Sequence, residues 1–383
     1  MIDIELQTIQ SGYDRETCWV HARAGAIPVA EGPPVVVLTT HKLRITGDDV
    51  FYPICDLRTD DGGTTWTEPL EHSDAFARRP LDGGAEVGVC DFWPMWHAAT
   101  GVLLGTGHTV IYEGDNIPPG HRPRSTIYSI YDPEARSWAP WKKLENKVEF
   151  DIDNEGAGST QRVDLPNGEI LLPSYYTKES VHMHHVQLAS TVMRCGFDGK
   201  TLTFLERGTE HTVKGGRGMG EPSLAYFDDR YFLTLRNDDC GYVTRGSDGL
   251  HFDPTRKWTF DDGSDLGNYN TQQHWLTMPD GLFLIYTRRG ANNDHVVRHR
   301  APLFIAQVDT ERLCVIRDTE QVLVPERGAR LGNFGVTKIS DIESWVTVAE
   351  WMQTLPPDYA DCRVCEQYGS DNSVFLAKVR SRG

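Results

Sequence analysis

Residues 59–66 read Thr-Asp-Asp-Gly-Gly-Thr-Thr-Trp, and this stretch says more about the fold than any other part of the chain. It fits the pattern S/T-x-D-x-G-x-T-W, which describes a hairpin turn between two outer strands of a sheet. We expect the Asp61 carboxylate to accept turn amides, Gly63 to supply a permissive φ, and Trp66 to pack between sheets. The acidic pair Asp60 and Asp61 is therefore read as a solvated turn, not as a catalytic or metal site.

Looser copies of this turn recur along the chain. Residues 247–252 read Ser-Asp-Gly-Leu-His-Phe, and residues 197–201 read Phe-Asp-Gly-Lys-Thr. Residues 132–138 form a fourth candidate, from Asp132 to Trp138. Each copy follows a strand-like run at the same place within its unit, which indicates an internal repeat.

Short apolar runs of the β type recur throughout, and no helical period is sustained over three turns. Examples are residues 34–40, 169–173 and 282–286, and several of these runs follow a Gly- or Asp-containing turn. The runs group into units at 15–66, 88–141, 158–206, 219–258, 270–317 and 330–380. Units of this length suit four short strands with their loops, which is the size of a propeller blade.

The first strand-like run, residues 2–9, precedes the first unit. We expect it to pair with residues 373–379 and so complete the last blade, because closure would remove two exposed sheet edges. No change of composition marks a linker. The sequence thus predicts an all-β chain, one domain over residues 1–383, folded as a six-bladed β-propeller of four-stranded antiparallel blades closed by its terminal strands.

The charge balance excludes two classes of partner. Asp and Glu number 55 against 38 Lys and Arg, for a net charge of −17. A field of this sign repels nucleic acid and anionic membranes, and no run approaches the ~20 apolar residues that span a bilayer. We expect neither partner, and an anionic substrate would need a local cluster of arginines.

The eight cysteines are scattered, mostly inside apolar runs, and are interpreted as buried free thiols of a reducing compartment. Cys362 and Cys365 form a lone CxxC without a second ligand pair. Residues 1–7 contain no basic region and no apolar run, so we expect no signal peptide. The sequence favours a cytoplasmic protein with no metal and no cofactor, and it says nothing about the oligomeric state.

With its Asp-box turns, the chain resembles the sialidase superfamily over most of its length. That resemblance implies an arginine on the first blade, which Arg23 in the segment 21–28 supplies beside His21. It implies an acid/base aspartate ahead of the first Asp-box, where Asp48 and Asp49 stand. Carboxylates in a partly apolar cleft can donate a proton at neutral pH.

The resemblance also implies a glutamate and an arginine on a middle blade, which Glu221 and Arg236 supply across a hairpin. A later arginine is offered by Arg298 or Arg300, and Arg300 is favoured because it directly precedes a strand-like run. Guanidinium forks bind a carboxylate bidentately. The family's nucleophilic tyrosine is missing, since residues 332–336 read Gly-Asn-Phe-Gly-Val.

Histidines and tyrosines in other loops point to a different chemistry. Tyr175 and Tyr176 precede a loop that contains His182, His184 and His185. Further histidines lie near the ends of strand-like runs, at positions 97, 108, 274, 295 and 299. A histidine and a tyrosine facing a uronate could act as base and acid for β-elimination, with an arginine neutralising the carboxylate.

Three functions are therefore open. The first is a sialidase-like exo-glycosidase for a terminal acidic sugar, with Arg23, Arg236 and Arg300 as the clamp and Glu221 as support. The second is a lyase for uronate-containing polysaccharide, using His184 or another histidine with Tyr175 or Tyr176. The third is a propeller that binds carbohydrate without cleaving it. A carbohydrate partner is common to all three.

Overall fold

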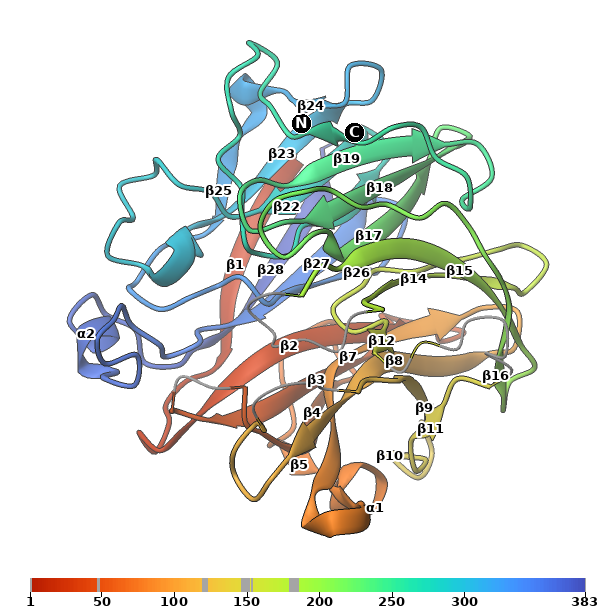
Figure 1. Ribbon diagram of the computed structural model, residues 1–383, viewed down its shortest axis with the longest axis vertical. Helices are drawn as coiled ribbons and strands as arrows, with labels where there is room; N and C mark the ends of the chain where they lie inside the picture. Colours follow the sequence, from red (N-terminus) through yellow and green to blue (C-terminus); the bar gives the residue numbers. More distant parts are fainter. Residues whose placement is uncertain are drawn as a thin grey trace.

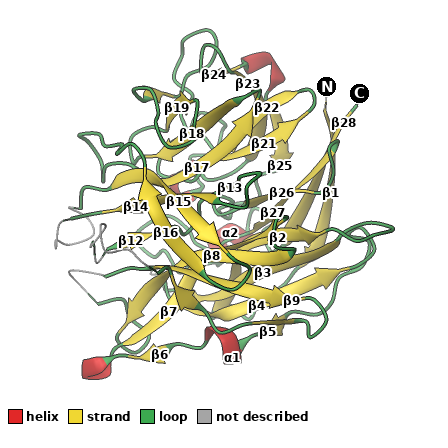
Figure 2. Cartoon of the chain, turned by 90° about the vertical axis from the view of Figure 1, so that its right-hand side faces the viewer, coloured by secondary structure: helices red, strands yellow, loops and turns green. Residues whose placement is uncertain are grey.

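The computed structural model describes residues 2–46, 49–118, 123–145, 152, 154–178 and 186–382. Within these residues the strands form six separate antiparallel sheets, arranged as the blades of a β-propeller (Figure 1). Figure 2, turned by 90°, shows that strands dominate the chain and that the helices are short. The prediction of an all-β, six-bladed propeller is confirmed.

The blades follow one another in sequence order. Blade 1 consists of β2 (Thr17–Ile27), β3 (Val35–Arg44), β4 (Phe51–Thr59) and β5 (Leu70–Glu71). Blade 2 consists of β6 (Arg79–Pro80), β7 (Glu86–His97), β8 (Val102–Tyr112), β9 (Thr126–Asp132), β10 (Ser137–Trp138) and β11 (Lys142–Lys143). Blade 3 consists of β12 (Glu155–Gly156), β13 (Val163–Asp164), β14 (Ile170–Tyr176), β15 (Ala189–Phe197) and β16 (Leu202–Arg207).

The remaining blades complete the ring. Blade 4 consists of β17 (Gly220–Phe227), β18 (Arg230–Arg236), β19 (Tyr242–Gly246) and β20 (Arg256–Lys257). Blade 5 consists of β21 (His274–Met278), β22 (Gly281–Tyr286), β23 (Leu303–Asp309), β24 (Cys314–Val315) and β25 (Gln321–Val324). Blade 6 consists of β26 (Gly335–Lys338), β27 (Glu343–Ala349), β28 (Val374–Ser381) and β1 (Ile2–Gln10).

Blades 2, 3 and 5 carry more than the four strands that the sequence predicts. In blade 3 the inner position is divided between β12 and β13, which both pair with β14, because the chain turns away from the sheet between them. Blade 2 has two extra strands, because β6 pairs with β7 and β11 pairs with β9 beside β10, and in blade 5 the extra strand β25 pairs with β23 beside β24. These additions lie at blade edges and leave the ring unchanged.

The terminal strands close the ring as expected. β1 runs antiparallel to β28, with a register from Ile2 opposite Ser381 to Gln10 opposite Val374. Both strands lie in the sheet ordered β1-β28-β27-β26, so the last blade contains the two ends of the chain. Closure removes the two free edges that an open blade would present.

An aspartate stands in the turn between the third and fourth main strands of five blades, within the described residues. The five are Asp61, Asp132, Asp198, Asp248 and Asp309, and each accepts two backbone amides of its own turn. Asp309 was missed because no glycine or tryptophan follows it. In the best copy, Trp66 of blade 1 packs against Trp345 of blade 6 at 6.3 Å between ring centroids.

The remaining elements are small. The helices α1 (Ser73–Phe76) and α2 (Arg363–Glu366) have four residues each, and none of the described helices is long and apolar enough to cross a bilayer. Among the described residues, the 3₁₀ turns η1 (Asp82–Gly84), η3 (Val297–His299) and η4 (Arg317–Thr319) lie in loops. All eight cysteines are buried free thiols, as the sequence predicts.

Trp345 offers a test of the contact between the first and last blades. Its side chain is 1% exposed, and replacing it by alanine should lower the free energy of unfolding by about 3–5 kcal/mol. Ile342→Ala is the matched control, because Ile342 is 58% exposed just before the same strand, and its effect should stay within ~0.5 kcal/mol. Denaturant unfolding followed by fluorescence measures both. Equal losses would contradict the packing role of Trp345.

Candidate functional site

Residues with a left-handed backbone conformation lie in or next to the inner strands of five blades. β-bulges interrupt β2, β7 and β17 near their beginnings, and each contains a non-glycine residue with positive φ: His21 (56°), Asp91 (54°) and Glu221 (42°). Ser159 (58°) lies between β12 and β13, and Asn270 (48°) precedes β21. A bulge re-aims the side chain it carries, and such strained backbone costs about 1–3 kcal/mol and gathers at functional sites.

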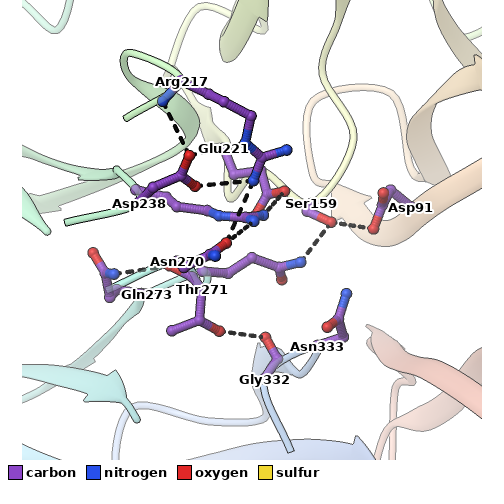
Figure 3. Close-up of polar contacts among 12 residues, drawn as sticks. Asp91, Ser159, Arg217, Glu221, Asp238, Asn270, Thr271, Gln273, Gly332 and Asn333 are labelled. Atoms are coloured by element: carbon purple, nitrogen blue, oxygen red, sulfur yellow. Dashed lines mark hydrogen bonds and ion pairs between the residues drawn. The ribbon is translucent and has the colours of Figure 1, made fainter. Parts of the chain in front are cut away.

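These residues bring polar side chains of different blades together. Figure 3 shows Asp91, Ser159, Glu221, Asn270 and Asn333, which come from blades 2 to 6, around a common centre. Neighbouring strands of a blade are antiparallel, so the innermost strand begins at the same side of the blade at which the next strand outward ends. The beginning of one and the end of the other therefore meet at the same rim of the propeller.

The deepest part of this centre is an ion pair between Arg23 and Asp91. Arg23 is 0% exposed. Its Nη2 atom donates to Asp91 Oδ1 at 3.2 Å, to Ser159 Oγ at 2.7 Å and to Gln272 Oε1 at 3.1 Å. Its Nε donates to the Phe334 carbonyl at 3.3 Å. Arg23 thus joins blades 1, 2, 3, 5 and 6, and the Arg23 guanidinium lies beneath the site rather than at its surface.

Asp91 is held as an anion. Burial alone would raise its pKa, but attraction to His21, Arg23 and His108 and the hydrogen bond from Ser159 hold the pKa well below its usual range. The histidines respond in the opposite sense, because burial lowers the pKa of His21 far below normal and that of His108 to about 3. At neutral pH the deepest part of the centre therefore holds the Asp91 carboxylate, the Arg23 guanidinium and two neutral imidazoles.

His21, predicted to bind substrate, lies behind Asn333. It is 2% exposed; its Nε2 accepts from Asn333 Nδ2 at 2.9 Å, and its Nδ1 lies 3.5 Å from Asp91 Oδ1. Asn333 in turn accepts from Arg300 Nη1 at 3.3 Å. Residues 332–334, where the resemblance implies a tyrosine, thus present an asparagine that connects the buried pair to Arg300.

Glu221 and Arg236, the pair predicted across the hairpin, form an ion pair. Arg236 also donates from Nη2 to Asn270 Oδ1 at 2.5 Å. Beside them Arg217 forms a bidentate pair with Asp238, with both contacts at 2.9 Å. Figure 3 shows these acidic groups and Asn270 on the blade 4 and 5 side of the centre. Glu221 and Arg236 meet, and Arg23 is connected to them only through intervening polar residues.

Three arginines at this rim form no ion pair within the part of the chain that the structure describes. Arg300 donates to the backbone carbonyl of Asn270, and Arg330 donates to Gln353 and stacks on Trp351 at 3.8 Å. Neither these two nor Arg298 forms an ion pair with a carboxylate of the described chain, although Arg300 and Arg330 are only 3% and 5% exposed. The site therefore holds two buried guanidinium groups, those of Arg300 and Arg330, that form no ion pair with a carboxylate of the described residues.

The pKa values reflect this surplus of charge. Burial, with repulsion from Arg330 and Arg298, lowers the pKa of Arg300 well below its usual range. Burial and Arg298, opposed by Asp49, lower the pKa of Arg330 to about 9, so it is still charged at neutral pH. Sequence reasoning missed Arg330. It lies in the segment Gly-Ala-Arg-Leu at 328–331, shortly before the inner strand β26, and Arg300 similarly lies shortly before the strand β23.

Asp49 faces the same arginines. Its side chain is exposed, yet surrounding protein atoms raise its pKa, with Asp91 adding to the effect and Arg330, Arg298 and Arg300 opposing it. The neighbouring candidate Asp48 lies outside the described residues, as does His184. Asp49 is thus a carboxyl group with a raised pKa, open to solvent, beside an arginine cluster.

The two tyrosines of β14 point in different directions. Tyr175 lies under the Arg124 guanidinium at 4.4 Å and near the His108 ring at 6.0 Å, so it borders the centre. Tyr176 belongs to a core cluster and hydrogen-bonds Glu210 and Arg207. Adjacent residues of a strand face opposite sides of a sheet, and Tyr176 is therefore directed away from the arginines.

The other candidates have structural contacts. The aromatic side chains of Trp93 and Trp275, which lie on inner strands, are 1% and 0% exposed and pack inside the core. Cys90, Asp91 and His108 bring atoms of the ligand type within 4.8 Å of one another. Because the Arg23 guanidinium lies 3.2 Å from Asp91 and repels cations, we assign no metal to this cluster.

Solved structures share the propeller. A protein of unknown function from Dyadobacter fermentans is 15% identical, with a TM-score of 0.61 over 98% of this chain and 99% of its own. The Hadza microbial sialidase Hz136 is 12% identical, with a TM-score of 0.60 over 97% of this chain and 68% of its own. Trypanosoma rangeli sialidase in complex with sialic acid is 14% identical, with a TM-score of 0.57. This chain spans 59% of that sialidase's length and 99% of its own.

No protein-family model matches the sequence, and no curated protein matches it. Identities of this size establish the fold alone. The shared fold is that of sialidases, and the residues of the centre have to be judged by their own geometry.

Asp91→Asn tests the buried ion pair. The change leaves the Arg23 guanidinium without its carboxylate, so the free energy of unfolding should fall by about 3–5 kcal/mol. The double variant Arg23→Met with Asp91→Asn should recover part of that loss, because it leaves no uncompensated charge. Asp60→Asn, at a surface pair 49% exposed on the acidic side, is the control and should change stability by less than ~1 kcal/mol. Equal effects in the two single variants would contradict the assignment.

Proposed function

We propose that this sialidase-like β-propeller is a glycosidase that removes a terminal sugar bearing a carboxylate, of the sialic acid or uronate type. One observation carries the proposal: Arg298, Arg300 and Arg330 meet at the propeller centre without a carboxylate partner among the described residues, in a chain of net charge −17. Most other arginines of the described chain are paired with acids.

The energetics favour an anionic ligand. A buried cation without a partner is costly, and the cost falls when an anion binds with good geometry. A guanidinium fork matches the two oxygens of a carboxylate and remains charged when buried. A neutral sugar would leave the charge uncompensated, so the cluster supports selection for an acidic one.

Asp49 is proposed as the proton donor. Its raised pKa increases the share of protonated carboxyl at neutral pH, and its exposure leaves the proton accessible to a leaving-group oxygen. Glu221 is paired with Arg236 and is therefore assigned to orienting that guanidinium. Asn333 takes the place where a nucleophilic tyrosine would stand, so attack by water is the proposed route.

The positions of three predicted histidines support hydrolysis over elimination, while His295 and His299 are each 25% exposed and leave the lyase to be separated by its product. His108 and His274 are 5% and 0% exposed, and His97 is hydrogen-bonded to Thr100 and to the Gly168 carbonyl. None of these three can reach a bound uronate as a base. Binding without cleavage remains the third function, and the experiments below separate it from the other two.

Arginine variants test the clamp. Arg300→Gln and Arg330→Gln should each weaken binding of N-acetylneuraminate or glucuronate about 10- to 100-fold, since a hydrogen bond to a charged group contributes about 1.5–3 kcal/mol. Arg312→Gln is the control, at a peripheral turn where Arg312 is 60% exposed, and should bind like the unchanged protein. Calorimetry measures binding, and thermal unfolding confirms the fold. Undiminished affinity in both site variants would refute the clamp.

Asp49→Asn tests the reaction. With 4-methylumbelliferyl sialoside and glucuronide as probes, kcat should fall about 100- to 10,000-fold while binding of the free acid is kept. An unsaturated product absorbing in the ultraviolet would identify a lyase. Saturable binding with no product from the unchanged protein would identify a carbohydrate-binding propeller.

A further inference from the structure

A hydrogen-bonded series of tyrosine, histidine and aspartate borders the arginine cluster and has no role in the steps above. Tyr269 Oη lies 2.5 Å from His299 Nδ1, and His299 Nε2 lies 3.1 Å from Asp294 Oδ1. Tyr269 immediately precedes Asn270, to which Arg236 and Arg300 are bonded. His299 stands between Arg298 and Arg300 in sequence. His299 thus lies in the same loop as Arg298 and Arg300, and Tyr269 is next to the residue that Arg300 contacts.

The contacts fix where the protons lie. Asp294 is 97% exposed on its side chain, and an ionised carboxylate can only accept, so His299 Nε2 carries the hydrogen. In the neutral imidazole Nδ1 is then the acceptor, and the Tyr269 hydroxyl donates to it. The lone pairs of the phenol oxygen are left to accept a proton from elsewhere.

The loop is held in this conformation by its surroundings. Arg298 and His299 are consecutive non-glycine residues with φ of 56° and 52°, a strained arrangement of the kind that gathers at functional sites. Asn293, 0% exposed, donates to the carbonyls of Arg288 at 2.9 Å and Ala301 at 2.6 Å. Arg289 covers the Tyr269 ring at 4.2 Å. The pair is therefore preorganised before a ligand arrives.

We propose that Tyr269 and His299 form the proton relay that activates water in this site. The proposal rests on the proposed glycosidase function and deepens it. The water oxygen bonds to the anomeric carbon, while one water proton passes to Tyr269 Oη and the tyrosine proton passes to His299 Nδ1. The glycosidic carbon–oxygen bond breaks, and the leaving oxygen takes the Asp49 proton.

Charge and atoms balance in this step. Asp49 becomes a carboxylate and His299 becomes an imidazolium, whose Nε2–H faces Asp294. Both are open to solvent, with His299 25% exposed, so the histidine returns its proton and Asp49 regains one before the next turnover. A base oriented by a third group, one hydrogen bond from the group it serves, is the general arrangement of such relays. Direct attack by water predicts a product with inverted anomeric configuration.

Tyr269→Phe and His299→Gln test the relay on the fluorogenic sialoside or glucuronide that the unchanged protein cleaves. Each should lower kcat about 100- to 10,000-fold with KM changed less than about threefold. Because the two act as a unit, the double variant should be no slower than the slower single variant. Added imidazole should restore part of the activity of His299→Ala, which a merely structural role would not allow.

Two variants serve as matched controls for the tyrosine and histidine changes. His295→Gln changes a histidine of the same loop that bonds Glu326 at 2.8 Å, and Tyr226→Phe changes a tyrosine that bonds Asp229 in a peripheral turn. Both should retain the kcat of the unchanged protein. Proton NMR of the first product should show inversion.

Two outcomes distinguish a failure of the relay from a failure of the glycosidase function. If the unchanged protein cleaves the probe but Tyr269→Phe and His299→Gln keep kcat within threefold, or if the first product retains its configuration, the relay is overturned and the glycosidase function stands. If the unchanged protein cleaves neither probe, the glycosidase function is overturned together with the relay.

Discussion

The buried ion pair of Arg23 and Asp91 is the contact on which the centre of the propeller depends. Blades of a propeller are separate sheets, and apolar packing alone joins them without fixing polar groups at the axis. Here a single guanidinium contacts Asp91, Ser159, Gln272 and the Phe334 carbonyl. A charge with this many partners sets the relative positions of the inner strands, and the polar residues at the rim lie above it on the same strands and loops.

The two levels of the centre differ in electrostatic balance. At the lower level every formal charge has its opposite, and the neighbouring histidines are neutral because burial depresses their pKa values. At the upper level Arg217 and Arg236 have acidic partners, whereas Arg298, Arg300 and Arg330 have none among the described residues. The lower level therefore suits a structural role, and the upper level suits recognition of an anion.

Much of the architecture follows from local patterns. The Asp61 turn, its looser copies and the terminal strands predicted six blades and their closure, because turn chemistry and strand alternation depend on residues near in sequence. Glu221 and Arg236 were found because a hairpin brings them together. Asp91, Asn270 and Arg330 were missed, since their roles arise from bulges and from neighbours in other blades. Arg23 was a candidate from the sequence, but its depth beneath the rim depends on four other blades and has no local signal.

The terminal closure has a consequence for how the molecule is made. Among the described strands β1 is synthesised first and its partner β28 last, so the outer strand of blade 6 stays unpaired until the other strands have been made. Contacts between such distant residues form slowly, and an exposed strand edge is prone to pair with the wrong chain. Closure of the ring is thus a late event in biosynthesis, and the polar centre, which draws on blades 1 to 6, is completed only at that moment.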